Sequence, residues 1–193
     1  MDTQLDFLYP AGALAVPGAQ DIVEPLIELT RFAAASHIQI VSTADAHSAD
    51  DPEFQTWRPH CVAGTIGQKK IAGTLLNQRL VVNSDPHALD AIHPVAGYAP
   101  QIIIEKQTID CFTNPNLHPL LDLLKADRYL VYGVATEVCV RCAAFGLLET
   151  GARVELVTDA IKSLSSSDQD EIVGQFQAQG GQLTTVGAVT ASD

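Results

Sequence analysis

Cys139 is the residue of this sequence best placed to act as a nucleophile. The apolar run at 129–134 predicts a strand, small residues interrupt it, and a helical pattern then runs from Val138 to Glu149. The first turn of a helix offers unpaired N–H groups and a partial positive charge, and both stabilise a thiolate. We therefore predict a reactive thiol, with a buried core cysteine as the equal alternative, because free cysteine is often buried.

A second group of residues has the side chains of a metal site. Asp45 and His47 stand at alternate positions, so in an extended chain they point to the same side, and His60 adds another nitrogen. Glu53 or Asp50 could complete a set of oxygen and nitrogen ligands, which suits Zn²⁺, Mn²⁺ or Fe²⁺. The spacing alone is weak evidence, and ordinary polar surface residues are the alternative.

Lys106 and Asp2 are the candidate ionisable partners of the thiol. Lys106 follows an apolar run at 102–104, where a partly desolvated ammonium would favour a thiolate. Asp2 and Asp6 could act in acid–base catalysis, although both stand at a chain terminus that could fray. A solvated surface position is the alternative for all three residues.

The elements between these residues would bring them to one edge of a sheet. Strands are predicted at 38–43, 79–83, 101–105, 129–134, 153–158 and 184–186, and helices at 21–33, 115–125, 138–149 and 168–179. This alternation predicts right-handed βαβ units and therefore an α/β fold of three layers, with a mostly parallel central sheet between helices. Asp45, Lys106 and Cys139 each follow a strand, and ligands of such folds bind at the carboxyl ends of the strands.

Length and composition set the broader class. The 193 residues, 47% of them hydrophobic, predict one domain over residues 1–193. No apolar run reaches the ~18 residues that span a bilayer, and no signal-peptide pattern is found, so we expect a cytoplasmic protein without a membrane partner. The formal net charge of −12 argues against binding to nucleic acid. The four cysteines are expected to be free thiols.

Cys139 and Cys142 also form a C-x-x-C pair at the start of a helix, as in thiol–disulfide oxidoreductases. This alternative belongs to a different class of enzyme. It leaves Asp45, His47 and Lys106 without a role, so we rank it below a hydrolytic nucleophile.

Four motifs resemble those of the isochorismatase-like cysteine hydrolases, and within that family the nicotinamidases and pyrazinamidases. They follow the order of the family and occupy residues 2–7, 45–61, 105–112 and 133–140. The resemblance extends from residue 2 to about residue 160 and implies a Rossmann-like sandwich of three αβα layers. Four ordered motifs are far more specific than any single one.

The resemblance also implies a role for each motif. It implies a catalytic triad of Asp2, Lys106 and Cys139. The backbone N–H groups of Ala135 and Cys139 would form an oxyanion hole beside a cis peptide bond between Val134 and Ala135. The implied metal ligands are Asp45, His47, Glu53 and His60, and the side chains implied to flank an aromatic substrate ring are Phe7 and Trp57.

The implied activity is hydrolysis of the amide of nicotinamide to nicotinate and ammonia through a thioester on Cys139, which would serve NAD salvage. A divalent metal would hold the pyridine nitrogen, with Zn²⁺ ranked before Mn²⁺ and Fe²⁺. The substrate would be a small molecule, and the oligomeric state stays open, a homo-oligomer included. The alternatives are another small-amide or carbamoyl hydrolase, and an inactive binding module of the same fold.

The sequence departs from the family at its start. Family members have a hydrophobic strand before the D-x-Q motif, in the centre of the sheet, whereas only Met1 precedes Asp2 here. We therefore expect the sheet to lack this first strand. The gap would expose sheet edges and leave Asp2 near a fraying end.

Overall fold

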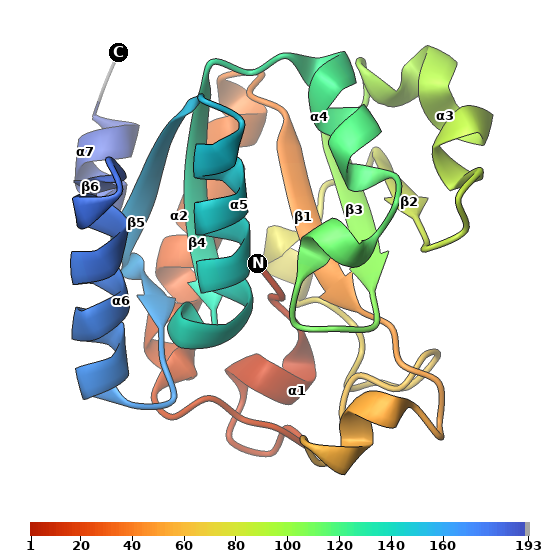
Figure 1. Cartoon of the computed structure of the whole chain (residues 1–193), viewed down its shortest axis with the longest axis vertical. Helices are drawn as coiled ribbons and strands as arrows, with labels where there is room; N and C mark the ends of the chain where they lie inside the picture. The colour runs from red at the N-terminus through yellow and green to blue at the C-terminus, as the bar shows by residue number, and fades with distance from the viewer. Residues whose placement is uncertain (192–193) are drawn as a thin grey trace.

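The structure is a computed structural model that describes residues 1–191, without the side chains of residues 91–94. Within these residues, strands and helices alternate along the chain (Figure 1). The strands are β1 (Ile40–Asp45), β2 (Arg79–Val82), β3 (Gln101–Lys106), β4 (Arg128–Val134), β5 (Arg153–Lys162) and β6 (Gln182–Thr184). The α-helices are α1 (Leu5–Leu8), α2 (Val23–Ala35), α3 (Ala88–Ala96), α4 (Leu117–Leu124), α5 (Arg141–Glu149), α6 (Ser166–Ala178) and α7 (Val186–Thr190). No helix among the described residues is both long and apolar enough to cross a membrane.

All paired strands run parallel, in two sheets of three strands. One sheet has the order β1-β3-β2 and the other the order β4-β5-β6. The register of β1 and β3 places Asp45 opposite Lys106, so these two polar residues leave the sheet side by side. The predicted α/β fold with a parallel sheet is confirmed.

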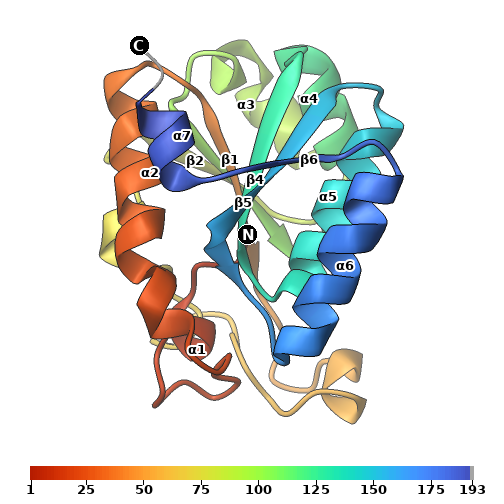
Figure 2. The ribbon, with the colours of Figure 1, turned by 90° about the vertical axis from the view of Figure 1, so that its left-hand side faces the viewer.

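Helices cover both faces of the strands, which gives three layers (Figure 2). On one face, α2 and α7 bury an apolar cluster that includes Leu26, Leu29 and Val189. On the other face, the cluster under α4, α5 and α6 includes Leu120 and Phe176. Each fully buried side chain of this kind contributes about 1.5–3 kcal/mol, so burial on both faces holds the strand ends in place.

A gap separates the two sheets, because β1 and β4 do not pair. A cavity of about 480 Å³ lies there, and its lining includes Val41 of β1 and Val131 of β4. Met1 enters it from the carboxyl end. Its amino group donates to the carbonyl oxygen of Tyr132 at 2.6 Å, and the N–H of Val134 donates to the carbonyl oxygen of Met1 at 3.3 Å. This is the hydrogen-bond pattern of a parallel pair, so Met1 extends the sheet of β4 by one paired residue at the edge of the gap.

Most predicted elements are found with shifted ends, and the largest error lies near the carboxyl terminus. The strand predicted at 184–186 ends at Thr184, and the following residues form α7. The side chain of Thr185 accepts a hydrogen bond from the N–H of Ala188 and thereby caps this helix. Residues 48–75, which carry two of the four implied metal ligands, contain only two short 3₁₀ turns, Pro52–Gln55 and Ala72–Thr74.

Candidate active site

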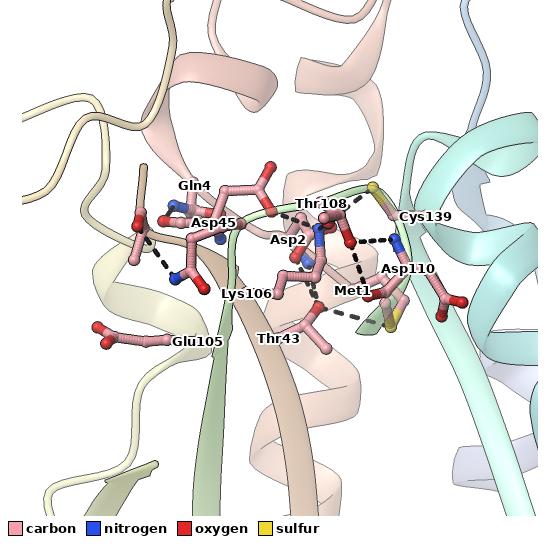
Figure 3. A network of polar contacts seen from close by, with 12 residues as sticks. Met1, Asp2, Gln4, Thr43, Asp45, Glu105, Lys106, Thr108, Asp110 and Cys139 are labelled. Atoms are coloured by element: carbon pink, nitrogen blue, oxygen red, sulfur yellow. Dashed lines mark hydrogen bonds and ion pairs between the residues drawn. The ribbon is translucent and has the colours of Figure 1, made fainter. Parts of the chain in front are cut away.

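Lys106 stands at the centre of a buried polar network at the carboxyl ends of β1, β3 and β4 (Figure 3). Its Nζ lies 3.1 Å from Oδ2 of Asp2 and 3.5 Å from Sγ of Cys139, and it forms a direct ion pair with Oδ1 of Asp45. It also donates to the carbonyl oxygen of Thr108 at 3.0 Å. The structure therefore brings the three residues of the predicted triad together, with one predicted metal ligand beside them.

The charge of Lys106 is fixed by its neighbours. Burial alone would lower the pKa of Lys106, but the carboxylates of Asp2 and Asp45 outweigh it and hold this pKa well above its usual value. Burial alone would raise the pKa of Asp45, but the charge of Lys106 and the nearby imidazoles of His47 and His60 outweigh it and lower this pKa. The two carboxylates therefore favour the charged form of Lys106.

Asp2 is held firmly despite its place next to the chain terminus. Its side chain is fully buried, and Oγ1 of Thr43 donates to its Oδ1 at 2.6 Å. The N–H of Asp2 in turn donates to Oγ1 of Thr43 at 3.2 Å, and Met1 pairs with β4 on the other side. The expectation that Asp2 lies on a fraying end is wrong, because hydrogen bonds to both sheets anchor residues 1 and 2.

Cys139 lies in the π-helical turn Thr136–Val140 (η5) that links β4 to α5. The preceding peptide bond between Val134 and Ala135 is cis, as the family resemblance implied. Burial raises the pKa of the Cys139 thiol well above its usual value, and the charge of Lys106 offsets only part of this effect. Burial thus opposes the stabilisation of a thiolate that the helix start and Lys106 were expected to provide.

Four side chains beside this network form a candidate metal centre. Oδ2 of Asp45 lies 3.5 Å from Nε2 of His60 and 3.8 Å from Nε2 of His47. Oε2 of Glu53 lies 3.9 Å from the same His47 nitrogen. A tetrahedral site with bonds of about 2.1 Å separates its ligands by about 3.4 Å. Ligand atoms of Asp45, His47 and His60 all lie within 4.8 Å of one another, so these three fit a metal with modest adjustment, whereas Glu53 groups with His47 and Asp51.

The chemistry of these donors also fits a divalent cation. Nε2 of His47 and Oε2 of Glu53 are buried, and neither has a hydrogen-bond partner among the described residues. Unpaired buried polar atoms are costly, so a cation would satisfy them. Two imidazole nitrogens and two carboxylates suit Zn²⁺, Mn²⁺ or Fe²⁺.

A cleft connects the thiol to the candidate metal centre. Asp45, Glu53 and His60 line one part of it, and Ala135 and Cys139 line another. The remaining lining is mostly apolar. It includes Phe7 and Trp57, which the family resemblance implies would flank the substrate ring, and also Leu14, Val16, Ile109, Val134, Val138 and Leu164. The cleft can therefore hold a small molecule with an apolar body and a polar group next to Cys139.

Sequence reasoning missed the residues that support the reactive groups. Nε2 of Gln4 donates to the carbonyl oxygen of Asp45, and the N–H of Asp45 donates to Oε1 of Gln4, both at 2.8 Å. The position of Gln4 within the D-x-Q motif was the only signal for this role. Thr43 could have been found from its position two residues before Asp45 on the same strand.

Asp50, named beside Glu53 as a candidate ligand, is exposed and bonds to Ser48.

A comparison with known protein families identifies the family of this chain. The isochorismatase domain family matches residues 1–188. The chain belongs to this family. All four family motifs fall within the matched residues, so the resemblance derived from the sequence is confirmed.

The similar proteins are amide-hydrolysing enzymes. A nicotinamidase of Saccharomyces cerevisiae is 21% identical over 215 residues, which cover 93% of this chain and 92% of the relative. A nicotinamidase/pyrazinamidase of Mycobacterium tuberculosis is 27% identical over 176 residues, which cover 86% of each. The crystal structure of a Pyrococcus horikoshii pyrazinamidase in complex with zinc superposes with a TM-score of 0.79, 26% identity and 95% coverage of both chains. The prediction that this isochorismatase-family chain is an amidohydrolase is confirmed.

Proposed function

We propose that this chain hydrolyses nicotinamide to nicotinate and ammonia, with Cys139 as the nucleophile and a divalent metal in the same cleft. The observation that carries this proposal is the position of Lys106, which contacts Cys139 and the candidate ligand Asp45 at once. A thiol for acyl transfer and a metal centre for substrate orientation thus share one small cleft. The names of the similar enzymes support nicotinamide as the substrate.

The first chemical step is the attack of Cys139 on the amide carbon. Asp2 takes the thiol proton as the C–S bond forms, and the electron pair of the carbonyl moves to its oxygen. Asp2 is close enough to interact with the thiol, and Lys106 balances the negative charge as it develops. The backbone N–H groups of Ala135 and Cys139 would hold the oxyanion.

Collapse of this intermediate releases ammonia. Asp2 gives the proton to the departing nitrogen, the C–N bond breaks, and a thioester remains on Cys139. Asp2 then accepts a proton from a water molecule, whose oxygen attacks the thioester carbon. The C–S bond breaks, the sulfur recovers its proton from Asp2, and the carboxylic acid product leaves and loses its proton to solvent to become the carboxylate.

The metal centre and the aromatic lining would orient the substrate. A divalent metal, with Zn²⁺ ranked first, would be held by Asp45, His47, Glu53 and His60, and when bound it offers a Lewis-acid contact for the ring nitrogen. Phe7 and Trp57 line the same cleft and would pack on the faces of a flat ring. We further propose that residues 1–193 act as one domain.

The test is ammonia release from nicotinamide by the purified protein after Zn²⁺, Mn²⁺ or Fe²⁺ is restored. We expect turnover by the wild type and by the Cys142→Ala control, and at least about a 1,000-fold loss in Cys139→Ala, since this variant lacks the thiol proposed to carry the acyl group. Activity that survives Cys139→Ala, or that needs Cys142 and a disulfide reductant, would contradict the proposal. Benzamide, which lacks the ring nitrogen, should be a poorer substrate.

A further inference from the structure

Asp51 is a buried carboxylate that takes no part in the proposed reaction. Its side chain is 8% exposed, and its two oxygens face two different candidate ligands. Oδ1 accepts a hydrogen bond from the N–H of Glu53 at 3.0 Å, and Oδ2 lies 3.1 Å from Nδ1 of His47. The contact with His47 has the distance of a hydrogen bond but not its full geometry. A single side chain therefore reaches both donors.

The contact with Asp51 bears on the tautomer of His47. A neutral imidazole carries one hydrogen, and a carboxylate next to Nδ1 favours the hydrogen on that atom. Nε2 then keeps its lone pair, and this is the atom that faces Asp45 and Glu53. The ring is fully buried and packs against the rings of Phe54 and His60, which hinders its rotation.

The same carboxylate fixes the chain at Glu53. Asp51 precedes the 3₁₀ turn Pro52–Gln55, and its bond to the N–H of Glu53 caps that turn. Pro52 further restricts the backbone at the start of the turn. The turn presents Oε2 of Glu53, buried and without a partner among the described residues, toward the imidazole of His47.

The other histidine of the cluster is supported differently. Nδ1 of His60 lies 2.8 Å from the carbonyl oxygen of Arg58, which is a main-chain atom. A substitution cannot remove that oxygen. The support of His47 by Asp51 is a side chain, so its contribution can be measured by mutation.

We propose that Asp51 is a positioning residue of the metal centre, which holds His47 with Nε2 free to bind a cation and fixes Glu53 beside it. This inference rests on the proposed metal centre. Loss of such an outer partner typically weakens metal binding by about 10–100-fold. An oxygen of Asp51 also lies within 4.8 Å of ligand atoms of His47 and Glu53, and in the proposed arrangement Asp51 supports the metal affinity from outside the four ligands.

The experiment compares Asp51→Asn with the neighbouring control Asp50→Asn. Asparagine keeps the size of Asp51 and its acceptor for the Glu53 N–H, but it places an amide donor opposite Nδ1 and so favours the hydrogen on Nε2. Zn²⁺ affinity is measured by competition with a chromogenic chelator, and the geometry by the visible absorption of the Co²⁺ complex. We expect D51N to bind Zn²⁺ about 10–100-fold more weakly with an altered Co²⁺ spectrum. D50N removes the same charge at an exposed site and should match the wild type.

A second variant separates misfolding from the proposed effect. Asp51→Ser keeps a short side chain that can cap the Glu53 turn but cannot reach His47, so its metal affinity should fall as well. The unfolding midpoints of the metal-free variants should match that of the wild type. Wild-type affinity in D51N or D51S, or an equal loss in D50N, overturns the proposal. A wild-type chain that binds no divalent metal also overturns it, whereas Cys139-dependent amide hydrolysis would still stand.

Discussion

The carboxyl ends of β1, β3 and β4 differ sharply from the gap between β1 and β4, although the two regions share the same strands. At the strand ends, buried charged groups contact one another around Lys106. In the gap, the same strands face a cavity of about 480 Å³ with a largely apolar lining. The two sheets are thus held together at the functional end by polar contacts, in addition to the helices that cover both faces.

Residues at the start of the chain carry this connection. Met1 bonds to Tyr132 and Val134 of β4, and Asp2 bonds to Thr43 of β1. The polar network therefore does two tasks, since it arranges the reactive groups and also links the two halves of the fold. The comparison predicts that changes in the network alter both activity and stability, whereas changes in the gap alter mainly stability.

Replacement of Lys106 should have the largest effect. Lys106→Met leaves the carboxylates of Asp2 and Asp45 buried without their cation, so we expect a loss of about 3–5 kcal/mol in the free energy of unfolding. Ammonia release should fall at least 1,000-fold, since Cys139 loses its positive neighbour. Denaturant unfolding and the nicotinamide assay measure the two effects. The control Lys69→Met changes an exposed lysine. An equal loss of stability and ammonia release there would show that the effect does not depend on the buried network around Lys106.

An apolar amino-terminal extension should stabilise the chain through the gap. Met1 already pairs with β4 in the parallel pattern, so five Val and Ile residues added before it would run along the cavity between β1 and β4. After the cost of ordering the backbone, we expect a gain of about 2–4 kcal/mol in the free energy of unfolding. A Gly/Ser extension of equal length is the control. Equal stability of the two extended chains would show that the gap does not accept a strand.

Replacing threonine by valine should affect stability and kcat differently at the strand ends and beside the gap. Thr43→Val removes the hydroxyl that bonds to Asp2 at 2.6 Å, so we expect a stability loss of about 1–3 kcal/mol and a lower kcat. Thr74→Val removes the hydroxyl that bonds to Thr3 at 2.8 Å beside the cavity, and it should reduce stability while kcat stays unchanged. Unfolding curves and steady-state rates test this. A fall in kcat for T74V but not for T43V would contradict the predicted difference between the strand ends and the gap.

The amino group of Met1 should give a smaller, pH-dependent effect. Burial, with a contribution from nearby Lys70, lowers its pKa from 8.0 to about 5. The unfolded chain therefore binds more protons between these values, so this group costs nothing above pH 8 and reduces stability as the pH falls toward 5. Met1 as a whole is only half-buried, so solvent weakens the effect. The Val/Ile-extended chain, which has an amide at this position, should lose this part of the pH dependence in unfolding curves recorded from pH 5 to 8.5.

The sequence predicted the fold well, and it predicted that the candidate site residues follow strands, because both depend on local patterns. Alternating strand and helix periodicity placed Asp45, Lys106 and Cys139 at strand ends, and the register of β1 and β3 then joined two of them. The raised pKa of Cys139 was not predictable, since it results from burial by distant segments. Sequence reasoning named Asp50 and overlooked Asp51, because neighbouring carboxylates look alike until the turn directs one of them inward.

The segment that forms α7 shows a further limit of sequence patterns. Its valines and threonine are typical of strands, and the helix forms because Thr185 caps it and Val186 and Val189 pack into the core. Short segments of this kind are decided by tertiary contacts. The residues that act through contacts between distant segments, such as Thr43 with Asp2, are missed for the same reason.

The central claim is that Cys139 carries the acyl group of the substrate within the network around Lys106. The direct test is an acid quench of the metal-loaded enzyme during nicotinamide turnover, followed by mass spectrometry of the peptides. We predict an adduct with the mass of a nicotinoyl group on the peptide that contains Cys139, and its absence from Cys139→Ala. Turnover without an adduct on that peptide, or with the adduct on Cys142, would contradict the account.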